Sequence, residues 1–516
     1  MTRKDSKSRT TGRSSAPASR STWRQVSAVA LAATTLAGCV VGPDYQKPFL
    51  AMPAAWSSQK KTAPVKPAQL SKWWQRLRDP ELDALVDEAV VGNLDVATAK
   101  ARIREARASY RQSAATLFPS ADSSGSATRN KTAATTSGGT ASDAYSQFQS
   151  GFDASWELDL FGANRRSVEA ARYGLDAAQE ELRSTLLTLV GDVASNYTQA
   201  RGYQARVQLA RRAAASQKQT AELTRTMAEA GTATAADVAK AKGQASSTEA
   251  DVPTLEASYA EAVHRLSVLT GRPPAALTER LKRSAPIPTP RLPIPTGVPA
   301  DILLSRPDVR MAERQYAEYT ARIGQAEAAR YPSVSLTGDI DTSAFKLGDL
   351  GKNSTIGWSF GPTLSMPLFN AGKLQAAVEI AKAERDQYFI AYKASVLTAL
   401  EDVENASVSL TQERIRNGKL ASSAKSYGDA ASLERTLYKS GETSLLDVLD
   451  AERSLYSAED ALLQSRVLIA TDYIALNKAL GGGWDGAIDS SRPEIVDAKT
   501  GPRLASQPRK NKDIQG

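Results

Sequence analysis

This 516-residue chain has almost none of two residue types that carry much enzyme chemistry: it has one histidine, His264, and one cysteine, Cys39. The sequence also has no phosphate-binding loop, no metal-ligand cluster and no nucleophile elbow. We interpret His264 as a residue on a helix surface. These absences argue against an enzyme, and they lead us to expect no metal and no bound cofactor.

The N-terminal region lacks a hydrophobic run long enough to cross a membrane as a helix. Val26 to Ala37 is apolar, but a spanning helix needs about 20 residues. The run follows residues 1–24, which contain seven Lys or Arg and one acid. This arrangement is typical of a signal peptide, which we assign to residues 1–38.

Cys39 follows small residues in the sequence Leu36-Ala37-Gly38, a pattern that resembles a lipoprotein box. In such a box the cysteine thiol is acylated and becomes the mature N-terminus, so we expect a covalent lipid on Cys39. The alternative is a chance cysteine behind an ordinary signal peptide. Val40 follows Cys39, where an inner-membrane retention signal would have Asp.

The net charge of +9 is concentrated at the two ends of the chain. Residues 1–24 contribute +6 and the tail from Arg492 contributes +3, which leaves the body neutral. A nucleic-acid-binding protein would carry a basic patch in its folded body. The charge distribution therefore counts against that role.

Two segments alternate strictly between apolar and polar residues. Thr355 to Leu368 places small polar residues on one side of an extended chain, and its other side is apolar. Phe152 to Phe161 alternates in the same way, with Glu157 and Asp159 on its polar side. Each segment follows a weaker extended stretch, which predicts β-hairpins at about 119–161 and 332–369.

Two interpretations of these strands remain open from the alternation alone. A strand half buried on a soluble core would alternate, and so would a membrane barrel strand of about 9 to 11 residues. Four membrane strands cannot close a barrel, because the smallest membrane barrels have about 8 strands. The second interpretation therefore requires copies of the chain, and two or three copies would both serve.

The chain repeats itself at an offset near 210 residues. Gly231, Asp237 and Val238 match Gly441, Asp447 and Val448, and similar matches precede them. Each half reads helix, hairpin, long helix, turn, helix. We place the first repeat at 79–271 and the second at 300–483. Residues 272–299, with eight prolines, form an extended linker between them.

Each half contains a long segment without proline, at 165–230 and at 374–439. As α-helices these segments would be about 99 Å long, which suits a bundle that crosses a compartment. We expect two shorter helices in each half to pack beside the long one. Residues 39–78 are predicted to be a lipidated tether, and residues 484–516 a disordered tail.

The chain resembles the TolC-like outer membrane factors, in particular the lipoprotein branch with NodT and OprM. The match runs from about Cys39 to Trp484 with the family spacing. The motifs that carry it are Leu36-Ala37-Gly38-Cys39 with Gly42-Pro43-Asp44-Tyr45, Trp73-Trp74 with Asp79-Pro80-Glu81-Leu82, Phe118-Pro119-Ser120, Tyr331-Pro332-Ser333, Ser305-Arg306-Pro307-Asp308, Tyr438 through Asp450-Ala451, and Leu480-Gly481-Gly482-Gly483-Trp484.

The resemblance implies a mixed fold, in which a trimer shares a 12-stranded membrane β-barrel that continues as a long periplasmic, coiled-coil α-barrel. Such a protein is the exit duct of a tripartite efflux system in the outer membrane. Its implied partners are a periplasmic adaptor and an inner-membrane transporter, often of the resistance-nodulation-division (RND) kind.

The resemblance also implies roles for the helix turns at the periplasmic tip. In the family these turns contact the adaptor, and carboxylates near them ring a closed aperture. The corresponding adaptor contacts are Gly231, Thr232, Gly441, Ser444 and Leu445, and the aperture hypothesis names Glu442, Thr443 and Asp447. The alternative for each acid is a solvated helix face or a helix N-cap.

Three other hypotheses remain at this stage. Glu157 and Asp159 are expected to face the barrel lumen, although simple solvation also explains them. A structural trimeric coiled-coil adhesin is the alternative to a duct, but an adhesin gives no reason for the internal duplication. Within the duct class, type I secretion and metal efflux stay open because the transporter selects the cargo.

Overall fold

The computed structural model describes residues 40–50, 71–131, 144–290, 300–497, 499 and 501–505. The predicted signal peptide and the predicted lipidation site at Cys39 lie outside these residues. The chain divides into two compact units. We call them the sheet unit (residues 1–43, 114–167 and 322–379) and the helical unit (residues 44–113, 168–321 and 380–516) and describe each by itself.

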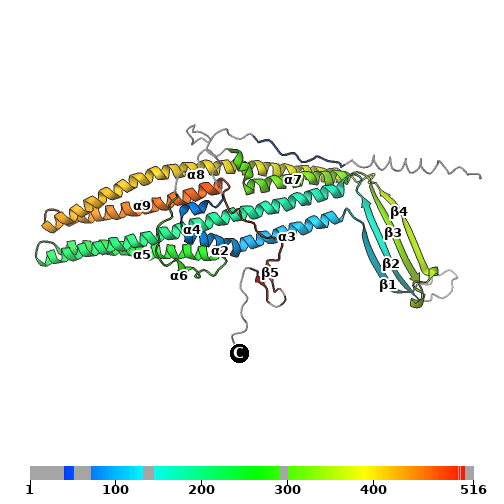
Figure 1. Cartoon of the computed structure of the whole chain (residues 1–516), viewed down its shortest axis with the longest axis horizontal. Helices are drawn as coiled ribbons and strands as arrows, with labels where there is room; N and C mark the ends of the chain where they lie inside the picture. Colours follow the sequence, from blue (N-terminus) through cyan, green and yellow to red (C-terminus); the bar gives the residue numbers. More distant parts are fainter. Residues whose placement is uncertain are drawn as a thin grey trace, which may run out of the picture. The chain divides into compact units, whose positions relative to one another are not determined.

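The sheet unit contains one four-stranded antiparallel sheet in the order β1-β2-β3-β4. Both predicted hairpins are present, and β2 pairs with β3 to join them (Figure 1). The first and last strands therefore each have one open edge in the described part of the chain. The strands are β1 (Ser120–Asn130), β2 (Tyr145–Leu158), β3 (Ser333–Ala344) and β4 (Ile356–Ser365).

The two faces of this sheet differ in chemistry, as the alternation predicts. On the apolar face Trp358, Phe360 and Leu364 are 76%, 69% and 68% exposed. A strand on a soluble core would bury such side chains, because burial of each contributes roughly 1.5–3 kcal/mol. The exposed apolar face therefore favours the membrane interpretation over the soluble one.

The helical unit contains most of both predicted long helices, and their shorter partners. Within it α4 lies beside α5, and α8 lies beside α9 (Figure 1), as the ion pairs Lys218–Glu249 and Arg435–Glu452 show. Each half of the chain thus repeats one plan, as predicted. The main helices are α2 (Pro80–Gly92), α3 (Leu94–Ala115), α4 (Ala163–Glu229), α5 (Ala235–Leu269), α7 (Pro307–Ala328), α8 (Lys373–Ser440) and α9 (Leu445–Ala479).

Short elements complete the two units. Around the helices are the 3-10 turns η1 (Trp73–Leu77) and η2 (Ala300–Ser305), the one-turn helix α6 (Thr278–Leu281), and a small hairpin of β5 (Ile495–Val496) with β6 (Arg503–Leu504). Between β3 and β4 lie η3 (Leu347–Asp349) and η4 (Asn353–Thr355).

The predicted tether at 39–78 is wrong for its last residues. Trp73 and Trp74 are each 1% exposed in the main core, and the Trp73 indole donates a hydrogen bond to the Gly482 carbonyl at 2.9 Å. Large aromatic side chains gain too much from burial to remain in a tether. The predicted start of the next helix is correct: Asp79 caps α2 by accepting from two backbone amides, with Pro80 at the first position.

The predicted extended linker at 272–299 is also wrong in its first part. Residues 278–281 form α6, and both Leu277 and Leu281 are buried in the main core. Arg280 forms ion pairs with Glu81 and Glu88 of α2. The prolines signalled extension, but two leucines four residues apart supply a buried helix face that outweighs them. Residues 291–299 lie outside the described residues.

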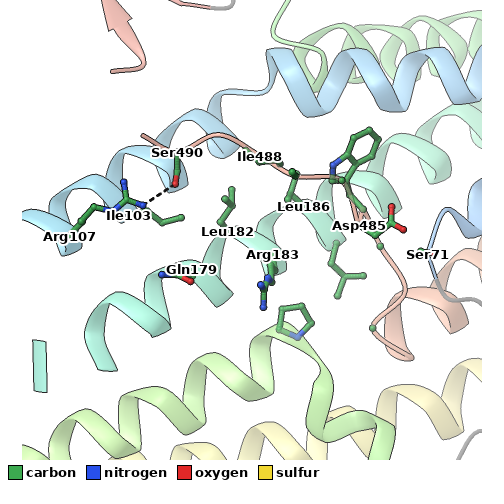
Figure 2. Close-up of a pocket in the computed structure, with 17 residues that line it drawn as sticks. Ser71, Ile103, Arg107, Gln179, Leu182, Arg183, Leu186, Asp485, Ile488 and Ser490 are labelled. Atoms are coloured by element: carbon green, nitrogen blue, oxygen red, sulfur yellow. Dashed lines mark hydrogen bonds between the residues drawn. The ribbon is translucent and has the colours of Figure 1, made fainter. Parts of the chain in front are cut away.

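The predicted disorder of 484–516 does not hold for the described part of that tail. Trp484 stacks on Trp74 with ring centroids 6.2 Å apart, and Glu494 forms an ion pair with Lys100 of α3 at 2.6 Å. The tail encloses a cleft of about 620 Å³ against α3 and α4, and Arg107 bonds Ser490 across it (Figure 2). The aromatic and charged residues of this tail find partners on the helices.

Among the described residues no helix is sufficiently long and apolar to be a candidate membrane span.

Candidate functional site

Both glycine turns of the helical unit have the same backbone geometry. Gly231 and Gly441 have φ of +78° and +81°, in the left-handed region that glycine adopts without a Cβ clash. The amide of the next residue bonds back five residues, from Thr232 to Met227 and from Glu442 to Leu437. This is a Schellman motif, which ends α4 and α8 in identical, well-defined turns.

Each turn leads into a helix through a capping box. Thr234 begins α5 and Ser444 begins α9, and each hydroxyl accepts from the amide three residues later. The side chains of Asp237 and Asp447 bond back to the capping residues. Because each carboxylate gains these hydrogen bonds, the pKa of both aspartates lies below its ordinary value.

The two turns lie at the same end of the helical unit. A small hydrophobic cluster near them contains residues of α4, α5, α8 and α9. In it the Tyr438 hydroxyl of α8 lies 3.1 Å from the Thr224 hydroxyl of α4. The buried members are Ala221, Ala241, Tyr438, Leu445, Val448 and Leu449.

A buried polar network lies about two to three helical turns from the glycine turns. The Glu452 side chain is 2% exposed, and it accepts from Arg435 and from the Thr220 hydroxyl, each at 2.7 Å. The network ties α9 to both α8 and α4. Its second carboxylate oxygen and the amide of Gln217, also buried, have no hydrogen-bond partner within the described chain. A buried carboxylate held in this way is costly to disturb.

The three residues of the aperture hypothesis make different contacts in the structure. Thr443 donates to Glu434 and Asp447, and the Asp447 carboxylate also accepts from Ser444. The capping role therefore accounts for Asp447. Glu442 is exposed in the turn and makes no side-chain hydrogen bond or ion pair with a described residue, and its role at an aperture stays a prediction.

The structure changes one of the expected adaptor contacts. Gly231, Thr232, Gly441 and Ser444 are exposed, as a docking surface requires. Leu445 is 7% exposed because it packs in the cluster behind the tip, whereas its neighbour Leu446 is 68% exposed. The sequence did not distinguish these two leucines, since the direction of each depends on how the four helices pack.

The polar face of the sheet carries a row of acids. The register places Asp122 opposite Asp153, and Asp153 opposite Asp339, on three neighbouring strands. Glu157 is exposed four positions along from Asp153, an even spacing in the strand, so it lies on the polar face as expected. Sequence reasoning missed the row, although aligning the two hairpins by their alternation would have revealed it.

The expectation that Asp159 faces a lumen is wrong. Asp159 lies after the end of β2, where its carboxylate accepts from the amides of Asn164 and Arg165 at 3.0 and 2.8 Å. It also forms an ion pair with the Arg165 guanidinium. Asp159 therefore satisfies the first amides of α4, which otherwise have no partner at a helix start.

No group of three or more His, Cys, Asp or Glu side chains that could hold a metal ion occurs in the part of the chain that the structure describes. The acids of the sheet row stand one per strand along the surface. Their arrangement can set a negative field over that face, which attracts cations and repels anions.

Comparisons with known proteins agree with this geometry. Nodulation protein T of Rhizobium leguminosarum bv. trifolii is 35% identical over 456 residues, which cover 87% of this chain and 96% of that protein. The solvent efflux pump outer membrane protein SrpC of Pseudomonas putida is 33% identical over 462 residues, covering 87% and 96%.

Solved structures show the same fold. The outer-membrane channel OprN superposes with a TM-score of 0.81 at 34% identity, covering 86% of this chain and 100% of that one. CusC, described in terms of transmembrane channel formation, gives 0.75 at 28% identity over 86% of this chain and 100% of that one. These relatives are channel proteins, and none of them supports the adhesin alternative.

The family model described as outer membrane efflux protein matches residues 85–272 and 298–482, one match in each half of the internal duplication. With its exposed apolar sheet face and its paired glycine turns, the chain belongs to the outer membrane efflux protein family.

Proposed function

We propose that three copies of this outer membrane efflux channel close one barrel and conduct cargo from a tripartite pump to the exterior. The observation that carries the proposal is the four-stranded sheet with open edges at β1 and β4 and an exposed apolar face. Open edges cannot persist in lipid, because each unpaired backbone group costs several kcal/mol. Three sheets joined edge to edge would satisfy them in a 12-stranded barrel.

The partners that we propose are a periplasmic adaptor and an inner-membrane transporter of the RND kind. Two turns of identical geometry at one end of the helical unit support adaptor docking, since they repeat the same surface twice in each chain. The exposed Leu446 offers an apolar anchor beside the second turn. The buried core of a protein interface is more apolar than its rim and is depleted of charged residues, so an exposed leucine suits such a core.

We also propose that Cys39 carries the lipid anchor. Support comes from the lipoprotein box in the sequence and from the position of the next residues. The Val41 amide bonds the Phe161 carbonyl, and Arg166 bonds the Val41 carbonyl, so the chain is attached to the sheet unit directly after Cys39. A lipid at Cys39 would therefore be tethered close to the barrel.

An efflux assay tests the adaptor proposal. Cells that lack this chain should accumulate a fluorescent pump substrate, and the wild-type chain should restore its efflux. Leu446→Asp should reach the outer membrane in normal amount and fail to restore efflux, because a charge replaces the apolar anchor. Glu261→Gln, at an exposed site on α5, is the matched control. Full efflux by the Leu446 variant would refute the docking role.

A metal-cation pump is the second candidate for the transporter that this channel serves. The specific observation is the 32% identity over 463 residues to the cation efflux system protein CusC of Escherichia coli. Other relatives are named for solvents, toluene and antibiotics. Growth of a deletion strain on transition-metal salts and on organic solvents distinguishes the two: metal sensitivity alone favours the cation pump.

A further inference from the structure

Cross-strand contacts on the polar face of the sheet follow one diagonal. Gln149 of β2 donates to Asp341 of β3 at 3.2 Å, and Gln147 donates to Ser343 at 3.2 Å. The next members of the same series are two aromatic residues. The rings of Tyr145 and Phe345 meet edge to face, with centroids 5.7 Å apart and planes at 83°.

This aromatic pair therefore lies on the polar face. Residues two apart in a strand share a face, so Tyr145 shares the face of Gln147, Gln149 and Asp153. Tyr145 is 42% exposed and Phe345 is 70% exposed. The pair stands at the end of the sheet where β1 ends and β2 begins, since β2 starts at Tyr145 and β3 ends at Ala344.

Exposed aromatic residues on this face need an explanation that those on the other face do not. Trp358 and Phe360 lie on the apolar face, where lipid would cover them. Tyr145 and Phe345 instead follow a row of amides, hydroxyls and acids. In a closed barrel such a face borders water, where an apolar ring gains nothing unless it meets a ligand.

We propose that Tyr145 and Phe345 form a binding site for organic cations at the outer mouth of the channel. The inference rests on the proposed trimeric barrel, in which three copies place six rings around the exit. The charge on the same face selects the class of ligand. Asp341 lies two contacts away along the diagonal, and the row of Asp122, Asp153 and Asp339 lies farther along the face.

Two physical effects then act on an organic cation as it leaves. The acids raise its local concentration in the lumen, and the ring faces attract its charge by cation–π interaction, which strengthens where water is displaced. Apolar groups on the cation also gain from contact with the rings. A neutral or anionic molecule gains less, so the mouth favours cargo that is both apolar and positively charged.

Current block in a planar bilayer tests the proposal. Tetraphenylphosphonium added to the wild-type oligomer should block the ionic current. In a variant with Tyr145→Ser and Phe345→Ser the half-blocking concentration should rise at least about tenfold. Trp358→Ser, on the opposite face, is the matched control and should leave the block unchanged. An unchanged block in the double variant would overturn the proposal.

A thiol label checks independently that the pair faces the lumen. Because the chain has one cysteine, Phe345→Cys adds a single new site, and Trp358→Cys does so on the opposite face. A charged methanethiosulfonate reagent should change the current through Phe345→Cys and not through Trp358→Cys. No change in either variant would refute the proposed binding site for organic cations. Absence of any wild-type current would instead refute the proposed duct, so the two failures are distinguishable.

Discussion

The buried ion pair between Arg435 and Glu452 should control the stability of α8 and α9 near the second glycine turn. Arg435→Met keeps the apolar stem and removes the charge, which leaves a carboxylate that is 2% exposed with the Thr220 hydroxyl as its remaining hydrogen-bond donor. Breaking a buried pair costs about 3–5 kcal/mol. Because the Arg435 side chain is 34% exposed and water reaches it, we expect the lower end, about 3 kcal/mol.

Amide hydrogen exchange of the intact oligomer measures this cost, because a lower free energy of local opening makes the amides exchange faster. A loss of about 3 kcal/mol should speed exchange of amides near Arg435 and Glu452 by about two orders of magnitude. Arg453→Met is the matched control, because Arg453 pairs with Asp450 on the surface, with side chains 65% and 61% exposed. Losing that pair should cost about 0.5 kcal/mol or less, so exchange should change by no more than about threefold.

The double variant decides whether the reasoning is correct. Replacing both Arg435 and Glu452 by Met removes the two charges together and fills similar volume. Such exchanges are often neutral or stabilising, so protection should return to near the wild-type level. If the single Arg435 variant exchanges like the wild type, or if the double variant exchanges as fast as the single one, the buried pair does not hold these helices.

Four further predictions concern the glycine turns and the N-terminal segment. Ser444→Ala should destabilise the start of α9 by about 1 kcal/mol, seen as faster amide exchange there, and Ser444→Asn should not. Because hydrogen bonds lower the pKa of Asp447, its stabilising effect is complete at neutral pH and is lost as pH falls below the ordinary value of 3.8 toward the lowered folded-state pKa. The protection factors of amides at the second turn, which correct for the intrinsic pH dependence of exchange, should fall in that window and stay constant at higher pH. Tyr45→Phe should make the N-terminal segment more sensitive to proteolysis, since Tyr45 donates to the buried Glu313 at 2.5 Å; Glu313 keeps longer hydrogen bonds from Arg314 at 3.3 and 3.4 Å, so the loss should cost about 1 kcal/mol. Cys39→Ser should abolish metabolic labelling with palmitate, and persistent label would contradict the anchor.

The main features of the fold could be predicted from the sequence because they depend on local periodicity. Alternation at Thr355 to Leu368 predicts a strand whatever the strand packs against. Both turns require a left-handed backbone, which glycine adopts more readily than other residues. The long helices follow from the absence of proline over more than sixty residues. Such signals do not depend on the rest of the chain.

Features that depend on tertiary partners were not predictable in the same way. Trp484 belongs to an ordered tail because Trp74, far away in the sequence, offers a stacking surface. Leu445 and Leu446 are identical neighbours, and four-helix packing alone determines which of them is buried. Asp159 fits the alternation of the strand, but its carboxylate instead accepts from two amides of the first turn of α4, which have no partner within the helix.

Electron cryo-microscopy of the detergent-extracted oligomer tests the central claim most directly. The account predicts three copies around one axis, with 12 strands in a closed barrel, Trp358 facing outward and Asp153 facing the lumen. A barrel closed by two copies with eight strands would contradict the trimer. A particle with Trp358 packed in an interior core, and no continuous lumen, would contradict the duct itself.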